Sequence, residues 1–443
     1  MISKGMEYLE SRLMFGMVPG LESTFKICAA LGDPQKAFRT VHVVGTNGKG
    51  SCCYYLSGIL QAHGIKTGLY TSPHLISLRE RIRVNDTPVS DADLDRLFLQ
   101  VKAAAEIAHV EPTFFEVVTV AAFLYYKEQG VQVAVLEAGM GGRLDSTAVA
   151  RGNIAVVTSI GLEHTEVLGS TESAILREKM AVMPDVIARN ASDEAISGKK
   201  VYVVGGLSER LLAEARDFAA AVEAEILVPE IREDIELPNL GRHYVENASL
   251  SLAAARLLLD SDVAAGQSAA GHYDDKLALK ALKTRSWPGR MQQLFDAKGS
   301  LRFILDGTHN SHAARRLAET LDRYFPGQKF PCVFGALKDK DVEEMLRFLA
   351  PYVSEWHLVR TPYERFREPE EIAAILEGLG QKVASTGPLS RDVLNNVTGS
   401  QSAQPTLVTG SLYMIGEVID LLKDDFEELA FFRGLTKTTN EHR

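Results

Sequence analysis

The chain has 443 residues, of which 46% are hydrophobic and 24% are charged, and 48 Lys and Arg against 58 Asp and Glu give a formal net charge of -10. This balance is typical of a globular protein with two domains or three small ones, and it supplies apolar material for more than one core. The negative charge argues against a nucleic-acid-binding protein, because contact with nucleic-acid phosphates needs a basic surface.

The four cysteines also limit the class of protein. Cys28, Cys52, Cys53 and Cys332 form no Cys-x-x-Cys pair, which argues against a zinc site and fits a reducing compartment. The first ten residues lack the apolar segment of a signal peptide, and no apolar run is long enough to span a bilayer. We therefore expect a cytosolic protein with no membrane partner.

Strand and helix patterns alternate through the first part of the chain. Apolar runs predict strands at 41–44, 131–136, 154–160 and 201–204, and helical periodicity predicts a helix at 51–63 and another that ends near 224. This order predicts an α/β fold with a mostly parallel sheet wrapped by helices.

A second alternation follows the turn-prone stretch Trp287-Pro288-Gly289. Its predicted strands are 303–305, 332–334, 357–359 and 406–408, and its predicted helices include 311–324 and 342–350. We therefore predict an N-terminal α/β domain at 1–297 and a smaller C-terminal Rossmann-like α/β domain at 298–443.

The first strand is joined to the first helix by Gly45-Thr46-Asn47-Gly48-Lys49-Gly50-Ser51. Glycines allow backbone N–H groups to point at phosphate oxygens, and the helix N-terminus adds partial positive charge. Lys49 is placed to reach the terminal phosphates and Ser51 a phosphate or its Mg²⁺. We therefore predict an ATP site at Asn47, Gly48, Lys49, Gly50 and Ser51, which makes the domain at 1–297 a P-loop ATPase domain; the alternative is a plain strand–helix turn with a surface lysine.

This loop resembles that of the Mur ligase superfamily, and its glycine after the lysine resembles folylpolyglutamate synthases and dihydrofolate synthases. Further blocks follow in the order of that family, over about residues 19–418: Thr71-Ser72-Pro73-His74, Thr113-Phe114-Phe115-Glu116, Glu137-Ala138-Gly139, Gly161-Leu162-Glu163-His164, Pro288-Gly289-Arg290 and Asp306-Gly307-Thr308-His309-Asn310. The resemblance implies that ATP phosphorylates the carboxylate of a folate or of dihydropteroate, and that L-glutamate displaces the phosphate to form an amide.

The resemblance also implies a magnesium site and catalytic residues. Ser72, Glu137 and His164 would hold the metal, and Lys49 and Lys179 would complete the catalytic group, with Lys179 carrying a carbamate. Taken alone, Ser72 reads as a turn hydroxyl, His164 as a cap or loop residue and Lys179 as a solvated lysine. Glu137 is different, because a charge that closes a buried strand is costly unless it is paired.

The same resemblance assigns substrate contacts. ATP would also contact Asn247, Arg290, Asp306 and His309, although Arg290 reads equally as a salt-bridge residue and Asp306 as a helix N-cap. The folate or pteroate slot would be lined by Thr113, Phe114, Phe115, Glu116, Leu144, Asp145 and Ser146. Phe114 and Phe115 are equally expected as core residues.

Two other functions remain open at this stage: another Mur-type amide ligase and a P-loop phosphotransferase. The sequence also leaves open whether the enzyme uses folates only or dihydropteroate as well. We expect a monomer, since the predicted site needs no second subunit.

Overall fold

The computed structural model describes residues 3–12, 20–183, 199–264, 272–397 and 404–438, without the side chains of 261–264. The chain forms two compact units. Unit 1 comprises Met1–Pro73, Arg79–Glu236 and Val245–Arg285; unit 2 comprises His74–Leu78, Leu237–Tyr244 and Ser286–Arg443.

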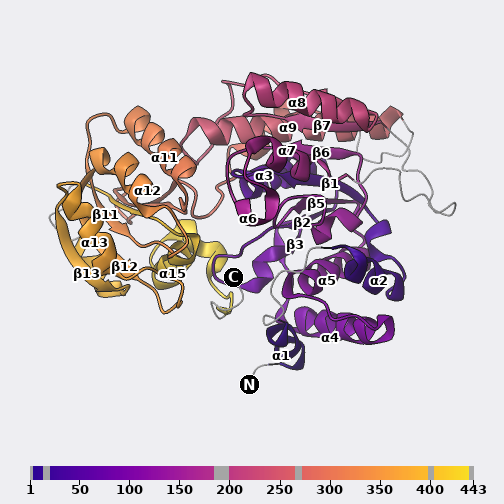
Figure 1. The fold of residues 1–443 in the computed structure, drawn as a ribbon, viewed down its shortest axis with the longest axis horizontal. Coiled ribbons are helices and arrows are strands. Elements are labelled where there is room, and N and C mark those ends of the chain that lie inside the picture. The colour runs from indigo at the N-terminus through magenta and orange to yellow at the C-terminus, as the bar shows by residue number, and fades with distance from the viewer. Residues whose placement is uncertain (1–2, 13–19, 184–198, 265–271, 398–403, 439–443) are drawn as a thin grey trace. The chain divides into compact units, whose positions relative to one another are not determined.

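Unit 1 is built on an eight-stranded sheet with the order β4-β3-β2-β5-β1-β6-β7-β8 (Figure 1). The strands are β1 (Arg39–Val44), β2 (Thr67–Tyr70), β3 (Ile82–Val84), β4 (Thr87–Pro88), β5 (Val133–Glu137), β6 (Ile154–Val157), β7 (Lys200–Val204) and β8 (Ala224–Leu227). All neighbouring pairs from β2 to β8 are parallel, while β3 and β4 are antiparallel additions. Central strands β1, β5 and β6 are almost wholly buried, as expected for a sheet covered on both faces.

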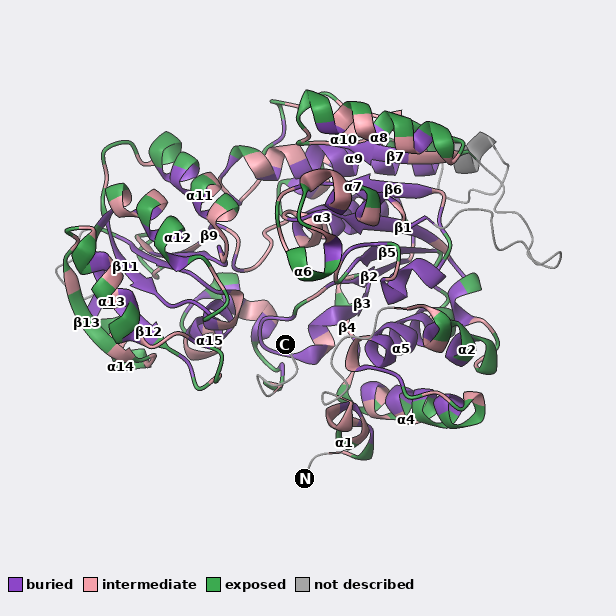
Figure 2. Cartoon of the chain, viewed as in Figure 1, coloured by how far each residue is buried: buried purple, intermediate pink, exposed green. Residues whose placement is uncertain are grey.

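Helices cover this sheet. They are α1 (Lys4–Ser11), α2 (Glu22–Ala30), α3 (Lys49–Ala62), α4 (Asp91–Ala108), α5 (Phe114–Glu128), α6 (Thr165–Leu168), α7 (Glu172–Met180), α8 (Glu209–Ala221), α9 (Arg242–Ala264) and α10 (Asp275–Leu282), with short 3₁₀ turns at Pro34–Lys36, Leu78–Arg81 and Ser146–Val149. Helix α4 packs against α1, α2 and α5 (Figure 1). Figure 2 shows that the central strands β1, β5 and β6 are buried while the outer sides of α4 and α8 are exposed.

Unit 2 contains a six-stranded sheet with the order β13-β12-β11-β14-β10-β9. Its elements are β9 (Gln292–Phe295), β10 (Leu301–Asp306), α11 (Ser311–Tyr324), β11 (Phe330–Phe334), α12 (Val342–Leu349), β12 (Val353–Arg360), α13 (Pro369–Gly378), β13 (Val383–Pro388), α14 (Arg391–Val397), β14 (Thr406–Thr409) and α15 (Leu412–Leu422), with 3₁₀ turns at Ala350–Tyr352 and Glu427–Phe432. Only β9 runs antiparallel to its neighbour. The α/β class and two parallel-dominated sheets confirm the predicted fold.

The division of the chain differs from the predicted boundary at 297. Strand β9 precedes that boundary, yet it pairs with β10 of the second sheet. Unit 2 also takes in 74–78 and 237–244, of which Leu75 and Ile76 pack in its hydrophobic core. A single cut in the sequence cannot describe these units, because packing assigns short distant segments to unit 2.

No helix in the described parts of the chain is long and apolar enough to cross a membrane.

Variants of Leu97 and Ile107 in α4 test whether the buried face of this helix contributes more to the free energy of unfolding than its exposed face. Leu97 is fully buried and Ile107 is 72% exposed. We expect Leu97→Ala to lower the free energy of unfolding by about 2–5 kcal/mol, because it leaves a cavity against the neighbouring helices. Ile107→Ala should change it by less than about 0.5 kcal/mol. Urea denaturation followed by circular dichroism measures both; equal losses would contradict the packing described for α4.

Candidate active site

The loop between β1 and α3 has a backbone that only glycine accommodates. Gly48, at the N-cap of α3, has φ of 88°, and a Cβ there would lie 2.6 Å from Oδ1 of Asn247. Asn247, one of the predicted ATP contacts, is therefore brought against the loop. The first helical hydrogen bond runs from Cys52 N to Gly48 O at 2.9 Å. The N–H groups of residues 49–51 lie in the first turn, where the helix offers no carbonyl, so they are suited to phosphate.

Two lysines converge on the start of this loop. Lys49 Nζ donates to the carbonyl oxygens of Gly45 at 2.8 Å and Thr46 at 3.2 Å. Lys179 Nζ, from α7, donates to the same Gly45 oxygen at 3.0 Å and forms an ion pair of 2.6 Å with Glu163 Oε1. The Lys179 side chain is only 1% exposed, so the reading of a solvated lysine is wrong.

The burial of Lys179 affects its protonation. Burial and the nearby charge of Lys49 lower the pKa of Lys179 to about 8, against the opposing effect of Glu163. Helix α7 is fixed here by its apolar residues Ile175, Leu176 and Met180, and Tyr202 Oη donates to Met180 O at 2.7 Å. The loop is thus faced by two amines with one acid between them.

The residues after β6 hold the first half of the loop. Ser159 O accepts from Thr46 N at 2.8 Å, and Ser159 Oγ accepts from Asn47 N and donates to Asn47 O, both at 3.0 Å. Thr158 Oγ1 donates to Asn47 O at 2.7 Å, and Thr46 Oγ1 donates to Gly161 O at 3.1 Å. The sequence interpretation missed Thr158 and Ser159, although two hydroxyl residues directly after a buried strand were a usable signal.

Glu137 and Ser72, two of the three predicted metal ligands, lie next to each other. Glu137 ends β5, pairs in register with Val43 of β1 and is 4% exposed. Its Oε2 accepts from the backbone N–H of Ser72 at 3.0 Å, just beyond the end of β2. Parallel strands place these residues at the carboxyl edge of the sheet, where ligands of such folds bind.

His164 lies in a different setting. It occupies the N-cap position of α6 with φ of 45°, makes no side-chain cap bond and is exposed. Among the described residues, no group of three or more His, Cys, Asp or Glu side chains is gathered as a metal site. The predicted ligand set of Ser72, Glu137 and His164 therefore stays a prediction; Ser72 and Glu137 are in contact through the Ser72 N–H.

The predicted folate segment at the start of α5 has a clear local role. Thr113 and Glu116 form a capping box, with Thr113 N donating to Glu116 Oε2 at 2.8 Å, and Thr24 Oγ1 donates to Glu116 Oε1 at 3.1 Å. Phe114 and Phe115 are both half-buried. A Cβ on Gly139 would lie 2.6 Å from Phe115, so this ring lies against the glycine-rich turn after β5.

The second predicted folate segment is organised by Asp145. Its Oδ2 accepts from the backbone N–H groups of Gly139 at 2.8 Å and Met140 at 3.0 Å. Its Oδ1 accepts from Thr147 N at 3.0 Å and Thr147 Oγ1 at 2.6 Å. Burial raises the pKa of this carboxyl, against the effect of these donors. Leu144 is half-buried and Ser146 buried, so Leu144 is the more accessible of the two.

In unit 2, Asp306 is the centre of a hydrogen-bond network. It is 4% exposed; Oδ2 accepts from Met291 N at 2.8 Å and Tyr244 Oη at 3.3 Å, and Oδ1 accepts from Thr308 N at 3.0 Å and Thr308 Oγ1 at 2.6 Å. The N-cap of α11 is Asn310, so the N-cap reading of Asp306 is wrong.

The other two ATP residues predicted for unit 2 both contact the Gly307 carbonyl. Arg290 Nη1 donates to Gly307 O at 3.3 Å, and His309 Nδ1 lies 2.8 Å from the same oxygen. These two residues and Asp306 are therefore gathered around one turn of unit 2.

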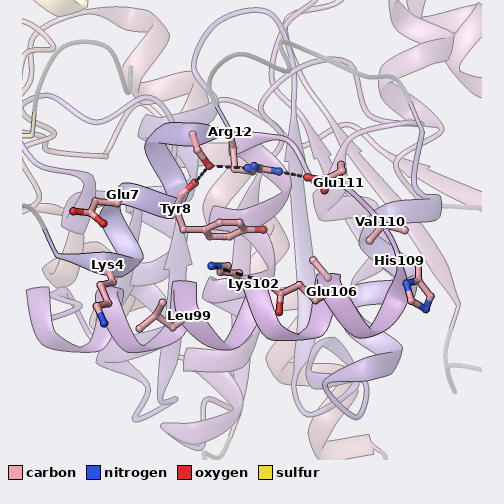
Figure 3. A pocket seen from close by; sticks show the side chains of 12 residues that line it. Lys4, Glu7, Tyr8, Arg12, Leu99, Lys102, Glu106, His109, Val110 and Glu111 are labelled. Carbon is pink, nitrogen blue, oxygen red and sulfur yellow. Dashed lines mark hydrogen bonds and ion pairs between the residues drawn. The ribbon is translucent and has the colours of Figure 1, made fainter.

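A cavity of about 700 Å³ lies elsewhere in unit 1, between α1 and α4 (Figure 3). Its lining includes Tyr8, with the Arg12 guanidinium 5.1 Å and Lys102 Nζ 5.9 Å from the ring centroid. None of the site residues predicted from the sequence lines it. The candidate active site therefore rests on the loop, not on this cavity.

Comparison with known proteins assigns both units to one class. The family described as "Mur ligase middle domain" matches residues 43–255, and "Mur ligase, glutamate ligase domain" matches residues 289–411. The fold and loop are thus those of a Mur-type ligase. Over 438 residues the chain is 32% identical to the dihydrofolate synthase/folylpolyglutamate synthase of Bacillus subtilis, covering 94% of this chain and 98% of that protein. The chain belongs to the dihydrofolate synthase/folylpolyglutamate synthase family.

Solved structures support the same relationship. Folylpolyglutamate synthase of Mycobacterium tuberculosis, complexed with ADP and AMPPCP, is 25% identical with a TM-score of 0.79, over 94% of this chain and 99% of that one. A bifunctional folylpolyglutamate synthase/dihydrofolate synthase with Mn, AMPPNP and L-glutamate bound is 27% identical with a TM-score of 0.76, over 94% and 97% of the two chains.

Ser159 provides a test of the loop's anchoring. We expect Ser159→Ala to raise the KM for ATP about tenfold with a smaller change in kcat, because two hydrogen bonds of about 1 kcal/mol each no longer hold Asn47. Steady-state kinetics measures this, and Ser159→Thr, which keeps the hydroxyl, should restore most of the affinity. The control is Thr67→Val, which removes a buried hydroxyl at the first residue of β2. An unchanged KM in Ser159→Ala would contradict the anchoring role.

Proposed function

We propose that this chain is an ATP-dependent ligase that joins L-glutamate to a folate, with dihydropteroate as a second acceptor. The observation that carries the proposal is the phosphate loop with Lys49 and Lys179 on one carbonyl, at the sheet edge where Glu137 ends β5. Family membership over 94% of the chain supports the same conclusion.

The chemistry follows from charge. A carboxylate oxygen of the folate attacks the γ-phosphorus of ATP, and the bond to ADP breaks to leave an acyl phosphate. The amine of glutamate then attacks the acyl carbon, inorganic phosphate leaves with the electron pair of its C–O bond, and the amine loses a proton to give the amide. Lys49 and the N–H groups of residues 49–51 would stabilise the phosphate charge in the first step.

We also propose that Mg²⁺ accompanies ATP in this site. Glu137 supplies a buried carboxylate and Ser72 a neighbouring hydroxyl, and hard oxygen donors of this kind suit Mg²⁺. When bound, the ion would neutralise phosphate charge. The Mn²⁺ found with AMPPNP in the related bifunctional enzyme supports this assignment.

We also propose a cellular location and an oligomeric state for the protein. All four cysteines are buried thiols without disulfides, which fits a reducing cytosol. We propose a cytosolic monomer, because the loop, both lysines and Glu137 all come from one chain. Gel filtration with light scattering tests the monomer.

One assay tests the activity itself. Purified protein with ATP and Mg²⁺ should release ADP only when a folate and L-glutamate are both present, with a product heavier by one glutamyl residue in mass spectrometry. Turnover with dihydropteroate would establish the second acceptor. ADP release without glutamate would instead indicate a phosphotransferase or hydrolase, and release with a different amine only would indicate another Mur-type ligase.

Lys49→Ala should lower kcat/KM in this assay by at least about a hundredfold, because it removes a cation from the phosphate loop. Lys26→Ala, which removes an exposed lysine of α2 paired with Glu22, is the matched control and should keep wild-type activity. Circular dichroism checks that both variants are folded. Wild-type turnover in Lys49→Ala would exclude the assigned role.

We further propose that Lys179 is carbamylated. Carbon dioxide adds to a neutral amine, forming an N–C bond with loss of a proton, and a pKa of about 8 leaves more neutral amine at pH 7 than an ordinary lysine has. The amine would then give up its ion pair with Glu163. With ¹³C-bicarbonate, the wild-type protein should show a carbamate carbon signal by NMR that is absent in Lys179→Met. Equal spectra for the two proteins would rule out the modification.

A further inference from the structure

A basic stripe runs along one face of α11 in unit 2. His312, Arg316 and Thr320 recur at four-residue intervals, so their side chains share one face of the helix. Thr320 Oγ1 donates to Arg316 O at 2.8 Å, which is consistent with this stacking. Arg315 points from a neighbouring face and is 67% exposed, whereas Arg316 is 34% exposed.

The segment 241–244 lies against this stripe. A Cβ on Gly241 would lie 2.7 Å from His243 Cε1 and 3.1 Å from Thr320 Oγ1, so His243 and Thr320 meet at this turn. Burial, followed by the charges of Arg316, Arg290 and His312, lowers the pKa of His243 to about 3. At neutral pH the imidazole of His243 is therefore uncharged, with basic groups from two different segments, α11 and the turn at Arg290, gathered around it.

Asp306 fixes this arrangement but does not neutralise it. Its carboxylate holds the backbone of Met291, next to Arg290, and the hydroxyl of Tyr244, next to His243. Four donors already occupy its two oxygens. Glu319 also lies at the stripe; it pairs with Arg315 at 3.2 Å and Arg316 at 3.5 Å and is 48% exposed. The charges of Arg316, Arg290 and His312 all act in the same direction on the pKa of His243, so the potential at this imidazole is positive.

We propose that Arg316, with Arg290 and His312, forms an oxyanion subsite of unit 2 that binds a substrate phosphate or carboxylate. A planar guanidinium presents paired donors that match the oxygens of either group. The proposal rests on the proposed ligase function, which supplies both anions: the phosphates of ATP and ADP and the carboxylates of glutamate. Arg316 would be a binding residue contributed by α11, in addition to the predicted contact from Arg290.

Adjacent arginines on α11 give a matched pair of variants. Arg316→Ala removes the guanidinium from the stripe, and Arg315→Ala removes one from the exposed face; both delete a partner of Glu319. Isothermal titration of the full chain with ADP, adenosine and tripolyphosphate measures phosphate binding, and the KM for L-glutamate measures carboxylate binding. Arg316→Lys keeps the positive charge but lacks the planar guanidinium and its paired donors.

If the anion is a phosphate, Arg316→Ala should weaken ADP and tripolyphosphate about tenfold or more and leave adenosine unchanged. If it is a carboxylate, the same variant should raise the KM for L-glutamate by a similar factor and leave ADP binding unchanged. Arg315→Ala should stay within about twofold of wild type in every measurement, and Arg316→Lys should fall between.

Unchanged ADP binding and an unchanged KM for glutamate in folded Arg316→Ala would overturn the subsite. Equal losses in Arg315→Ala and Arg316→Ala would also overturn it, since they would indicate a general effect of charge. A wild-type protein without ligase activity would defeat the proposed function; loss of tripolyphosphate binding in Arg316→Ala would still support the subsite. If the wild type is inactive and also fails to bind tripolyphosphate, both the ligase function and the subsite are contradicted.

Discussion

The Gly45 carbonyl is the point on which the nucleotide loop depends, because it accepts hydrogen bonds from both Lys49 and Lys179. Two ammonium groups that share one acceptor repel each other, and Glu163 is the acid that pairs with Lys179. A buried lysine without such partners would be strongly destabilising. The ion pair with Glu163 holds Lys179 beside the loop, and Lys49 is the cation that would meet a polyphosphate.

The loop divides its backbone between two tasks. Thr46 and Asn47 bond to Ser159, so the first half of the loop is held by the strand end that follows β6. The second half opens α3, whose first-turn N–H groups have no helical acceptor. This division makes a glycine after Lys49 compatible with the proposed phosphate binding, because the amides that would face a phosphate belong to the helix start. Lys49 reaches back to the anchored half of the loop.

The sequence predicted the buried centre of each sheet and missed its edges, for a physical reason. Strands β1, β5 and β10 each contain a short, mostly apolar buried stretch, and such stretches are recognisable because both faces of the sheet are covered. Strands β8 and β13 are half-exposed or exposed and lack that signal. Likewise Glu137 was predictable as a charge closing a buried strand, whereas the burial of Lys179 arises from the packing of α7 and has no local signature.

Two aspartates that the resemblance assigns to substrate binding, Asp145 and Asp306, have carboxylates that are occupied by donors of the protein itself. Asp145 and Asp306 each begin an Asp-x-Thr turn, in which Oδ1 accepts from the threonine N–H at 3.0 Å and its hydroxyl at 2.6 Å. In both, Oδ2 accepts two more donors from neighbouring segments. A carboxylate whose lone pairs are all used by the protein fixes the backbone around it and attracts little else. Asp145 in unit 1 and Asp306 in unit 2 therefore act as backbone supports, and the basic groups Lys49, Arg290 and Arg316 are the ones proposed to bind anionic substrates.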